Sequence, residues 1–125
     1  MERIQYTTDA GVRILDIDCR NCSADEVAEI ADKVPEAVLK EPEGSVLLLC
    51  DFRGSQFSRK SLERLKLATA RDSRQIRRSA WIIDGNLPKP FHQALRSFSG
   101  RELRLFSERQ EAIDFLVEEA KSQAS

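Results

Sequence analysis

The sequence predicts an α/β domain with a single mixed β-sheet of about five strands and about four helices. Two short alternating segments, at 4–6 and 12–14, are separated by turn residues, which is typical of a β-hairpin. Two apolar runs without alternation, at 45–50 and 79–83, predict parallel strands buried on both faces. Amphipathic segments with helical spacing lie between and after these strands, so the expected order is ββαβαβαβα.

The totals predict one domain over residues 1–125. Hydrophobic residues are 41% and charged residues 33%, which is the balance of a globular protein. No run approaches the ~18 apolar residues of a membrane helix, and the start lacks the apolar core of a signal peptide, so we expect a cytoplasmic protein without a membrane span. Three cysteines in such a protein are expected to be reduced thiols, and the sequence indicates no cofactor.

Local signals place the first helix and its end. Residues 23–26 match a capping box, and apolar side chains then recur at helical spacing up to Val34. Pro35 lacks an amide proton and clashes with the preceding turn, so we expect a kink or a restart there. The turn residues 42–44 close this segment.

Later signals place three more helices and an edge strand. Ser58 is a predicted N-cap, with Phe57 and Leu62 at the positions of a hydrophobic staple. We expect the second helix to close on the four arginines between 71 and 78, where cations favour a helix C-terminus. A short helix over 90–98, an edge strand over 102–106 and a helix after the capping box at 107–110 complete the expectation, with no internal repeat.

The net charge of −1 conceals an uneven distribution of charge. Residues 1–50 carry 5 basic and 11 acidic side chains, residues 51–104 carry 13 and 5, and residues 105–125 carry 2 and 5. One surface could therefore attract an anionic partner, or the opposite charges could pair across the fold. With a pI of about 5.9, one Tyr and one Trp, the composition does not favour a nucleic-acid partner.

Polar residues follow the predicted parallel strands at 18–22, 51–55 and 84–86, where α/β sheets bind ligands. Asp51 and Asp84 could serve Mg²⁺ or acid/base chemistry, but aspartates are also routine turn residues. No lysine comes directly after the predicted strand that ends at Phe106, and the chain has no glycine-rich phosphate loop or nucleophile elbow. These observations favour a protein that is not an enzyme.

The cysteines leave two further alternatives open. Cys19 and Cys22 lie between a strand and a helix, as in thiol-redox proteins, although Ser23 starts the helix after both sulfurs. A zinc site from these cysteines with Cys50 and His92 has only one short ligand pair, and Cys50 is better explained as a buried residue.

The pattern resembles the STAS superfamily, in particular the branch similar to the sporulation anti-anti-sigma factor and often described as STAS/SEC14-like. The resemblance spans most of the chain and rests on residues 46–54 followed by Phe57 and a helix, on 78–83, on 98–106 and on 111–116. It implies a STAS-like fold and a bacterial signalling module that works by binding. It also implies that a kinase or anti-sigma partner docks near the start of the second helix, where serine phosphorylation switches the contact.

The sequence departs from the family at the phosphorylated position. Where the motif has Asp-Ser-Ser/Ala-Gly, this chain has Ser58-Arg59-Lys60-Ser61, so Lys60 aligns with the phosphorylated serine. The leading hypothesis is a regulatory module that docks a protein through residues 51–66. The candidate partner- or ligand-binding residues are Asp51, Arg53, Ser55, Ser58, Arg59, Lys60, Ser61 and Asp84.

Two other functional hypotheses stand beside this one. The SEC14-like connection implies that some relatives hold an apolar ligand between helices and sheet, so a carrier or sensor for a small acyl or other anionic ligand is the first. A thiol-redox protein using Cys19 and Cys22 is the second. The sequence also leaves a homodimer open.

Overall fold

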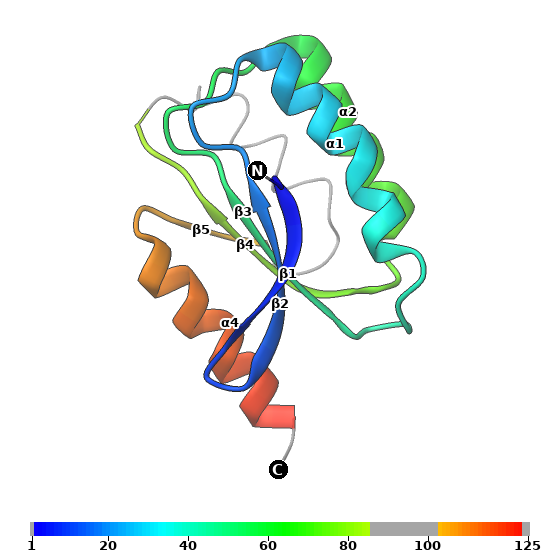
Figure 1. Cartoon of the computed structure of the whole chain (residues 1–125), viewed down its shortest axis with the longest axis vertical. Coiled ribbons are helices and arrows are strands. Elements are labelled where there is room, and N and C mark those ends of the chain that lie inside the picture. The colour runs from blue at the N-terminus through cyan, green and yellow to red at the C-terminus, as the bar shows by residue number, and fades with distance from the viewer. Residues whose placement is uncertain (1, 86–102, 124–125) are drawn as a thin grey trace.

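A computed structural model describes residues 2–85 and 103–123 and places one mixed sheet between helices (Figure 1). The five strands neighbour one another in chain order, and all pairs except the first are parallel. The strands are β1 (Ile4–Asp9), β2 (Val12–Asp18), β3 (Val46–Asp51), β4 (Ile76–Ile82) and β5 (Leu103–Phe106). Because β2 to β5 are parallel, their carboxyl ends meet at one edge of the sheet.

The predicted hairpin is confirmed, with longer strands than the sequence pattern marked. β1 pairs with β2 from Ile4 opposite Ile17 to Asp9 opposite Val12. The connection is a two-residue turn whose members, Ala10 and Gly11, have positive φ angles of 49° and 78°. Positive φ at both central positions defines the type I′ turn, whose twist matches that of the strands.

In the described part of the chain, three helices cover the two faces of the sheet. Helices α1 (Ala24–Val38) and α2 (Arg59–Asp72) lie side by side on one face, and α4 (Arg109–Gln123) lies on the other (Figure 1). The predicted capping box at Ser23 and Glu26 is confirmed, and Ser58 caps α2. No helix in the described part of the chain is long and apolar enough to cross a membrane.

The restart expected at Pro35 is wrong, because one helix, α1, runs through this residue to Val38. Pro35 lies in the last turn of the helix, so its missing amide removes one hydrogen bond near an end that would fray in any case. Its carbonyl still accepts a hydrogen bond from the Leu39 amide at 2.9 Å, and its ring is buried in the core.

The expected arginine-rich end of α2 is also wrong. The helix ends at Asp72, and Arg77 and Arg78 lie in β4, which begins at Ile76 rather than near Ser79. Both guanidinium groups pair with Glu119 of α4 at 3.4 Å. Their charge therefore serves the contact between β4 and α4 and does not add to a basic face of α2.

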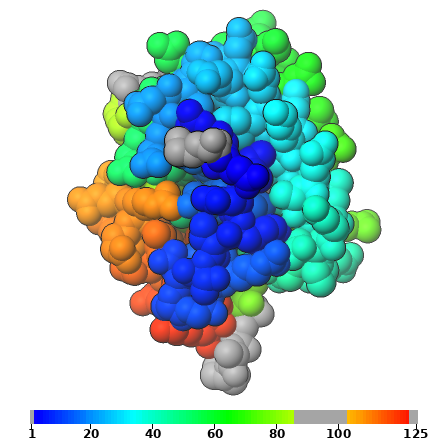
Figure 2. All heavy atoms as spheres, in the orientation of Figure 1, coloured from blue at the N-terminus to red at the C-terminus, as the bar shows by residue number. Residues whose placement is uncertain are grey.

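Each face of the sheet has its own hydrophobic core. The larger core joins α1 and α2 to side chains such as Leu15, Leu48 and Trp81, and the smaller one joins α4 to Leu49 and Ile82. All six residues of β3 are buried, as expected for a central strand covered on both faces. In Figure 2 the hairpin (blue) occupies the face between α1 (cyan) and α4 (orange to red).

The α/β class with one mixed sheet of five strands is confirmed. The described residues contain three helices, and the fourth, expected over 90–98, lies outside them, as do Asn86 and His92. The edge strand expected over 102–106 is confirmed as β5, which pairs with β4 alone among the described strands.

Candidate functional site

The carboxyl edge of the sheet carries two five-residue turns with the same internal bonds. They follow β2 and β3 at residues 18–22 and 51–55, and we call them the twin turns. In the first, Asp18 Oδ1 accepts hydrogen bonds from the Arg20 amide and Nε, both at 3.0 Å, and Oδ2 accepts one from Nη2 at 3.1 Å. In the second, Asp51 accepts the same three bonds from Arg53 at 3.2, 2.9 and 2.7 Å.

The backbone of the twin turns is also the same. The Cys22 amide donates to the Cys19 carbonyl, and the Ser55 amide donates to the Phe52 carbonyl. The fourth residue of each turn has a positive φ, 58° at Asn21 and 74° at Gly54. Asparagine and glycine are the residues that tolerate this left-handed conformation most readily.

The twin turns lie against each other because β2 and β3 are paired in register, with Asp18 beside Asp51. Two further backbone bonds continue the pairing past the strands, from the Cys19 amide to the Asp51 carbonyl at 2.9 Å and from the Asn21 amide to the Arg53 carbonyl at 3.0 Å. A Cβ atom on Gly54 would lie 2.2 Å from Asn21 Oδ1. The close packing of the two turns therefore requires glycine at this position.

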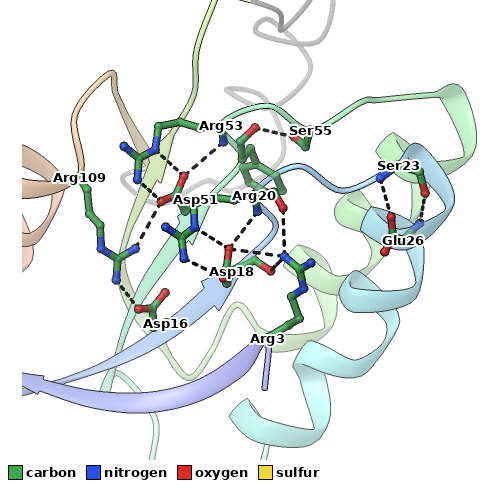
Figure 3. A network of polar contacts seen from close by, with 11 residues as sticks. Arg3, Asp16, Asp18, Arg20, Ser23, Glu26, Asp51, Arg53, Ser55 and Arg109 are labelled. Atoms are coloured by element: carbon green, nitrogen blue, oxygen red, sulfur yellow. Dashed lines mark hydrogen bonds and ion pairs between the residues drawn. The ribbon is translucent and has the colours of Figure 1, made fainter. Parts of the chain in front are cut away.

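A third arginine connects the second turn to the opposite face of the sheet (Figure 3). Arg109, the first residue of α4, donates from Nη1 to Asp51 Oδ2 at 3.4 Å and pairs through Nη2 with Asp16 of β2. Asp51 is fully buried, whereas the side chain of Asp18 is 17% exposed. The hydrogen bond from Arg20 lowers the pKa of Asp18 below its usual value.

This arrangement does not suit metal or acid/base chemistry. Asp51 is bonded to two guanidinium groups, and Asp84 Oδ2 accepts the Gly54 amide at 2.6 Å, so both aspartates hold the turn. Within the described ranges, no group of three or more His, Cys, Asp or Glu side chains could hold a metal ion. The structure brings Asp51, Arg53, Ser55 and Asp84 together, as the sequence predicted.

The three serines near α2 are engaged in local hydrogen bonds. Ser55 Oγ is buried and donates to the Phe52 carbonyl at 2.6 Å. Ser58 and Ser61 cap α2 reciprocally, each side chain accepting from the backbone amide of the other. Ser61 is fully buried, so Ser58 is the one serine of the three that a solvent molecule can reach.

Exposed cations surround the start of α2. Arg59 and Lys60 are exposed in its first turn, and the side chains of Arg20 and Arg53 are 49% and 38% exposed on the twin turns. Arg20 and Arg53 pair with Asp18 and Asp51, and farther along the helix Arg64 lies 3.8 Å from Asp32 of α1, so much of the charge pairs within the fold. Arg59 and Lys60 therefore form the basic surface beside the loop that joins β3 to α2.

The cysteines are buried and free. Burial raises the pKa of Cys19 and of Cys22, and it raises that of Cys50 well above its usual value. A redox-active thiol requires a lowered pKa, so these environments are the opposite of what the thiol-redox hypothesis needs.

A cavity of about 50 Å³ lies between the α1–α2 layer and the sheet. Its lining is largely apolar and includes Ile17, Val34, Leu48 and Leu65. Among the described residues, five polar or charged side chains also line it, those of Thr69, Asp72, Ser73, Ser79 and Trp81. Trp81 Nε1 is buried without a hydrogen-bond partner, and burial raises the pKa of Asp72 to about 6.

Sequence reasoning did not select several residues of the site and the cavity. The repeated Asp-x-Arg pattern at 18–20 and 51–53 was a signal for the twin turns, including Arg20. The sequence carried no comparable signal for Arg109 or Asp16, because their contact joins positions 93 residues apart. Asp72 gave no signal either, since acidic residues near a helix end are usually exposed.

Comparisons with known proteins identify the fold. No protein-family model matches the sequence, and no curated protein does. A solved structure of an uncharacterized protein from Shewanella loihica PV-4, of the DUF3478 family and with a SpoIIAA-like fold, is similar to this chain with a TM-score of 0.69. The two are 15% identical, and the match covers 90% of this chain and 91% of that one. The chain therefore has a SpoIIAA-like fold, which is the STAS-like architecture that the sequence predicted.

Proposed function

We propose that this protein is a non-enzymatic regulatory module of the STAS type, which acts in the cytoplasm by docking a protein partner. The docking surface consists of residues 51–66, from the second twin turn to the middle of α2. The observation that carries the proposal is a loop held rigid on the inside and cationic on the outside. A rigid surface binds without the entropic cost of ordering flexible loops.

Several bonds support the rigidity of this surface. The loop is fixed by the pairing of Asp51 with Arg53, by the Gly54 amide bond to Asp84 and by the Gln56 amide bond to the Cys22 carbonyl at 2.9 Å. The capping of α2 by Ser58 fixes the direction of the helix that follows. The exposed charges at the start of α2 are positive, so we expect the partner surface to be acidic. Like charges facing each other across an interface cost several kcal/mol.

Phosphorylation is not expected to switch this surface at Ser55 or Ser61. Both hydroxyl groups are buried and hydrogen-bonded, so a kinase could reach them only after the loop had opened. A phosphate on Ser58 would replace the cap of α2. Of the three serines of the docking surface, Ser58 is therefore the one whose phosphorylation could switch binding. A kinase or an anti-sigma-like protein is the partner class that the family resemblance implies.

The test compares capture by three forms of the tagged protein from a lysate of its own cells. Arg59→Glu with Lys60→Glu reverses the charge of the docking surface, and Arg71→Glu reverses an exposed charge at the other end of α2. We expect one acidic partner to be captured by the wild type and by the Arg71 variant, and lost with the double variant at an unchanged melting temperature. Equal capture by all three forms would overturn the proposal.

The cavity supports a second function, as a carrier or sensor for a small ligand. The observation that favours it is a largely apolar cavity with an unpaired indole N–H in its wall. Buried polar groups are nearly always hydrogen-bonded, so an orphaned one indicates a missing partner. Native mass spectrometry of freshly purified protein tests this function, and a spectrum with the mass of the chain alone would count against it.

A further inference from the structure

The polar groups of the cavity restrict what it can bind. Trp81 lies in β4 and Asp72 is the last residue of α2, and their side chains line the same space. Trp81 is 4% exposed and Asp72 is 3% exposed. The indole N–H can only donate a hydrogen bond, whereas a carboxylate can only accept one.

The two groups differ in their partners within the described part of the chain. Trp81 Nε1 has no acceptor, whereas the Asp72 carboxyl accepts a hydrogen bond from its own backbone amide and forms no ion pair with a described residue. No lysine or arginine among the described residues lines the cavity. A buried polar group without a partner is destabilising, so Trp81 Nε1 calls for an occupant that accepts a hydrogen bond, and the Asp72 carboxylate has room to accept a further one.

Water alone does not match this lining well. A water molecule needs ~10–15 Å³ of such space, so the volume is sufficient for a few of them, but each also needs two to four polar partners. The remaining walls are formed largely by aliphatic and aromatic side chains, including Phe52, Leu65 and Ile76. An occupant with an apolar body and one polar end satisfies both parts of the lining.

We propose that the cavity binds a small apolar molecule with a neutral polar end, of the class of aliphatic alcohols and amides, and discriminates against carboxylate ions. This inference rests on the second function proposed above and specifies its ligand. The polar end donates a hydrogen bond to Asp72 and accepts one from Trp81 Nε1. A carboxylate would bring a second negative charge against Asp72 in a space where no described cation compensates it.

The titration of Asp72 supports a neutral ligand. Burial raises the pKa of its carboxyl to about 6, and Arg71 beside it lowers that pKa only in part. The thiols of Cys19 and Cys50 also line the cavity, and the negative charge of Asp72 contributes to the raised pKa of Cys50. Among the described titratable groups that line the cavity, none carries a positive charge that would balance an added anion.

The experiment uses Trp81, the only tryptophan of the chain, as a built-in reporter. Its fluorescence is followed while the protein is titrated at neutral pH with n-butanol, butyramide or butyrate, which share one carbon skeleton. We expect saturable changes with the alcohol and the amide, and affinity at least about tenfold weaker for butyrate, because burying an uncompensated charge is costly.

Three variants make the result specific. Asp72→Asn removes the charge at nearly constant shape and is expected to reduce the difference in affinity between butyrate and butanol. Asp32→Asn, on the exposed side of α1, is expected to leave that difference unchanged. Ala68→Leu adds volume to the cavity wall and is expected to abolish the response to all three probes.

The outcomes separate the two proposals. If butyrate binds as tightly as butanol or more tightly, the inference about the ligand is overturned while the cavity keeps its proposed binding function. If no probe changes the fluorescence of the wild type, both are overturned and the cavity holds water. A response that persists unchanged in the Ala68→Leu variant would place binding elsewhere and would also overturn the inference.

Discussion

The twin turns have the same backbone and the same Asp-x-Arg clamp, but they lie in different environments. The first is at the surface, with the Arg20 side chain 49% exposed, and within residues 2–85 and 103–123 Asp18 reaches one other cation, Arg3, at 3.7 Å. The second buries Asp51 completely and adds Arg109 from the opposite face of the sheet. The comparison teaches that one local pattern can be a surface turn in one place and an anchor between layers in another.

The largest difference is expected between Asp51→Asn and Asp18→Asn. Breaking a buried ion pair leaves an uncompensated charge, so Asp51→Asn should lower the free energy of unfolding by about 3 kcal/mol. Exposed pairs contribute about 1 kcal/mol or less, so Asp18→Asn should have a small effect. Urea unfolding of both variants measures the difference, and equal losses would show that burial does not distinguish the turns.

The left-handed residues give the next comparison. Gly54→Ala places a methyl group against Asn21, whereas Gly11→Ala in the hairpin turn adds one in open space at a similar φ. Both substitutions should lower the free energy of unfolding by about 1–2 kcal/mol, because alanine disfavours the left-handed conformation. Gly54→Ala also introduces a clash. Thermal unfolding should therefore show a larger loss for Gly54→Ala.

A double variant isolates the clash. Combining Asn21→Gly with Gly54→Ala removes the side chain that the new methyl group would meet, so part of the stability should return. If the double variant is no more stable than Gly54→Ala alone, the contact between the two turns does not set the requirement for glycine.

The fifth residue of each turn gives a smaller effect. Ser55 donates a buried hydrogen bond to the Phe52 carbonyl, whereas Cys22 occupies the same place in the first turn with its side chain in the core. Ser55→Ala should cost about 1 kcal/mol, the net contribution of a typical hydrogen bond. Chemical unfolding measures this loss. A neutral or stabilising effect would show that the Ser55 hydroxyl does not stabilise the turn.

The smallest effect is a dependence on pH. The pKa of Asp18 is lowered in the folded protein, so its contribution to stability is present above the unfolded pKa of 3.8 and is lost as pH falls through the folded pKa. The difference in stability between the wild type and Asp18→Asn should therefore shrink below about pH 4. A difference that stays constant under acid conditions would contradict the role of the carboxylate.

The sequence was sufficient for most of the fold, because hydrophobic periodicity and caps are local signals. The hairpin, the buried strand β3 and the caps at Ser23 and Ser58 could all be predicted. The start of β4 could not, since Arg77 and Arg78 extend to Glu119, a partner about 40 residues away. The expected restart at Pro35 was wrong for a related reason. The burial of Pro35 in the tertiary structure outweighed the tendency of proline to interrupt a helix.

The candidate site was predictable only where its residues follow one another in the chain. The sequence located Asp51, Arg53 and Asp84 at strand ends, and the structure brings them to one edge. The expectation of no internal repeat overlooked the twin turns, since each is too short to stand out without its pairing. The polar groups of the cavity come from α2 and β4, which only the folded chain brings together.

The order of the strands also has a consequence for synthesis on the ribosome. Because each strand pairs with the one made just before it, the sheet can grow as the chain emerges, with α1 and α2 closing their face early. Among the described elements, the other face, with Leu47, Leu49 and Ile82, is covered by α4, the last of them to be made. The nascent protein therefore exposes an apolar surface in its late stages, and we expect chaperones to engage it there.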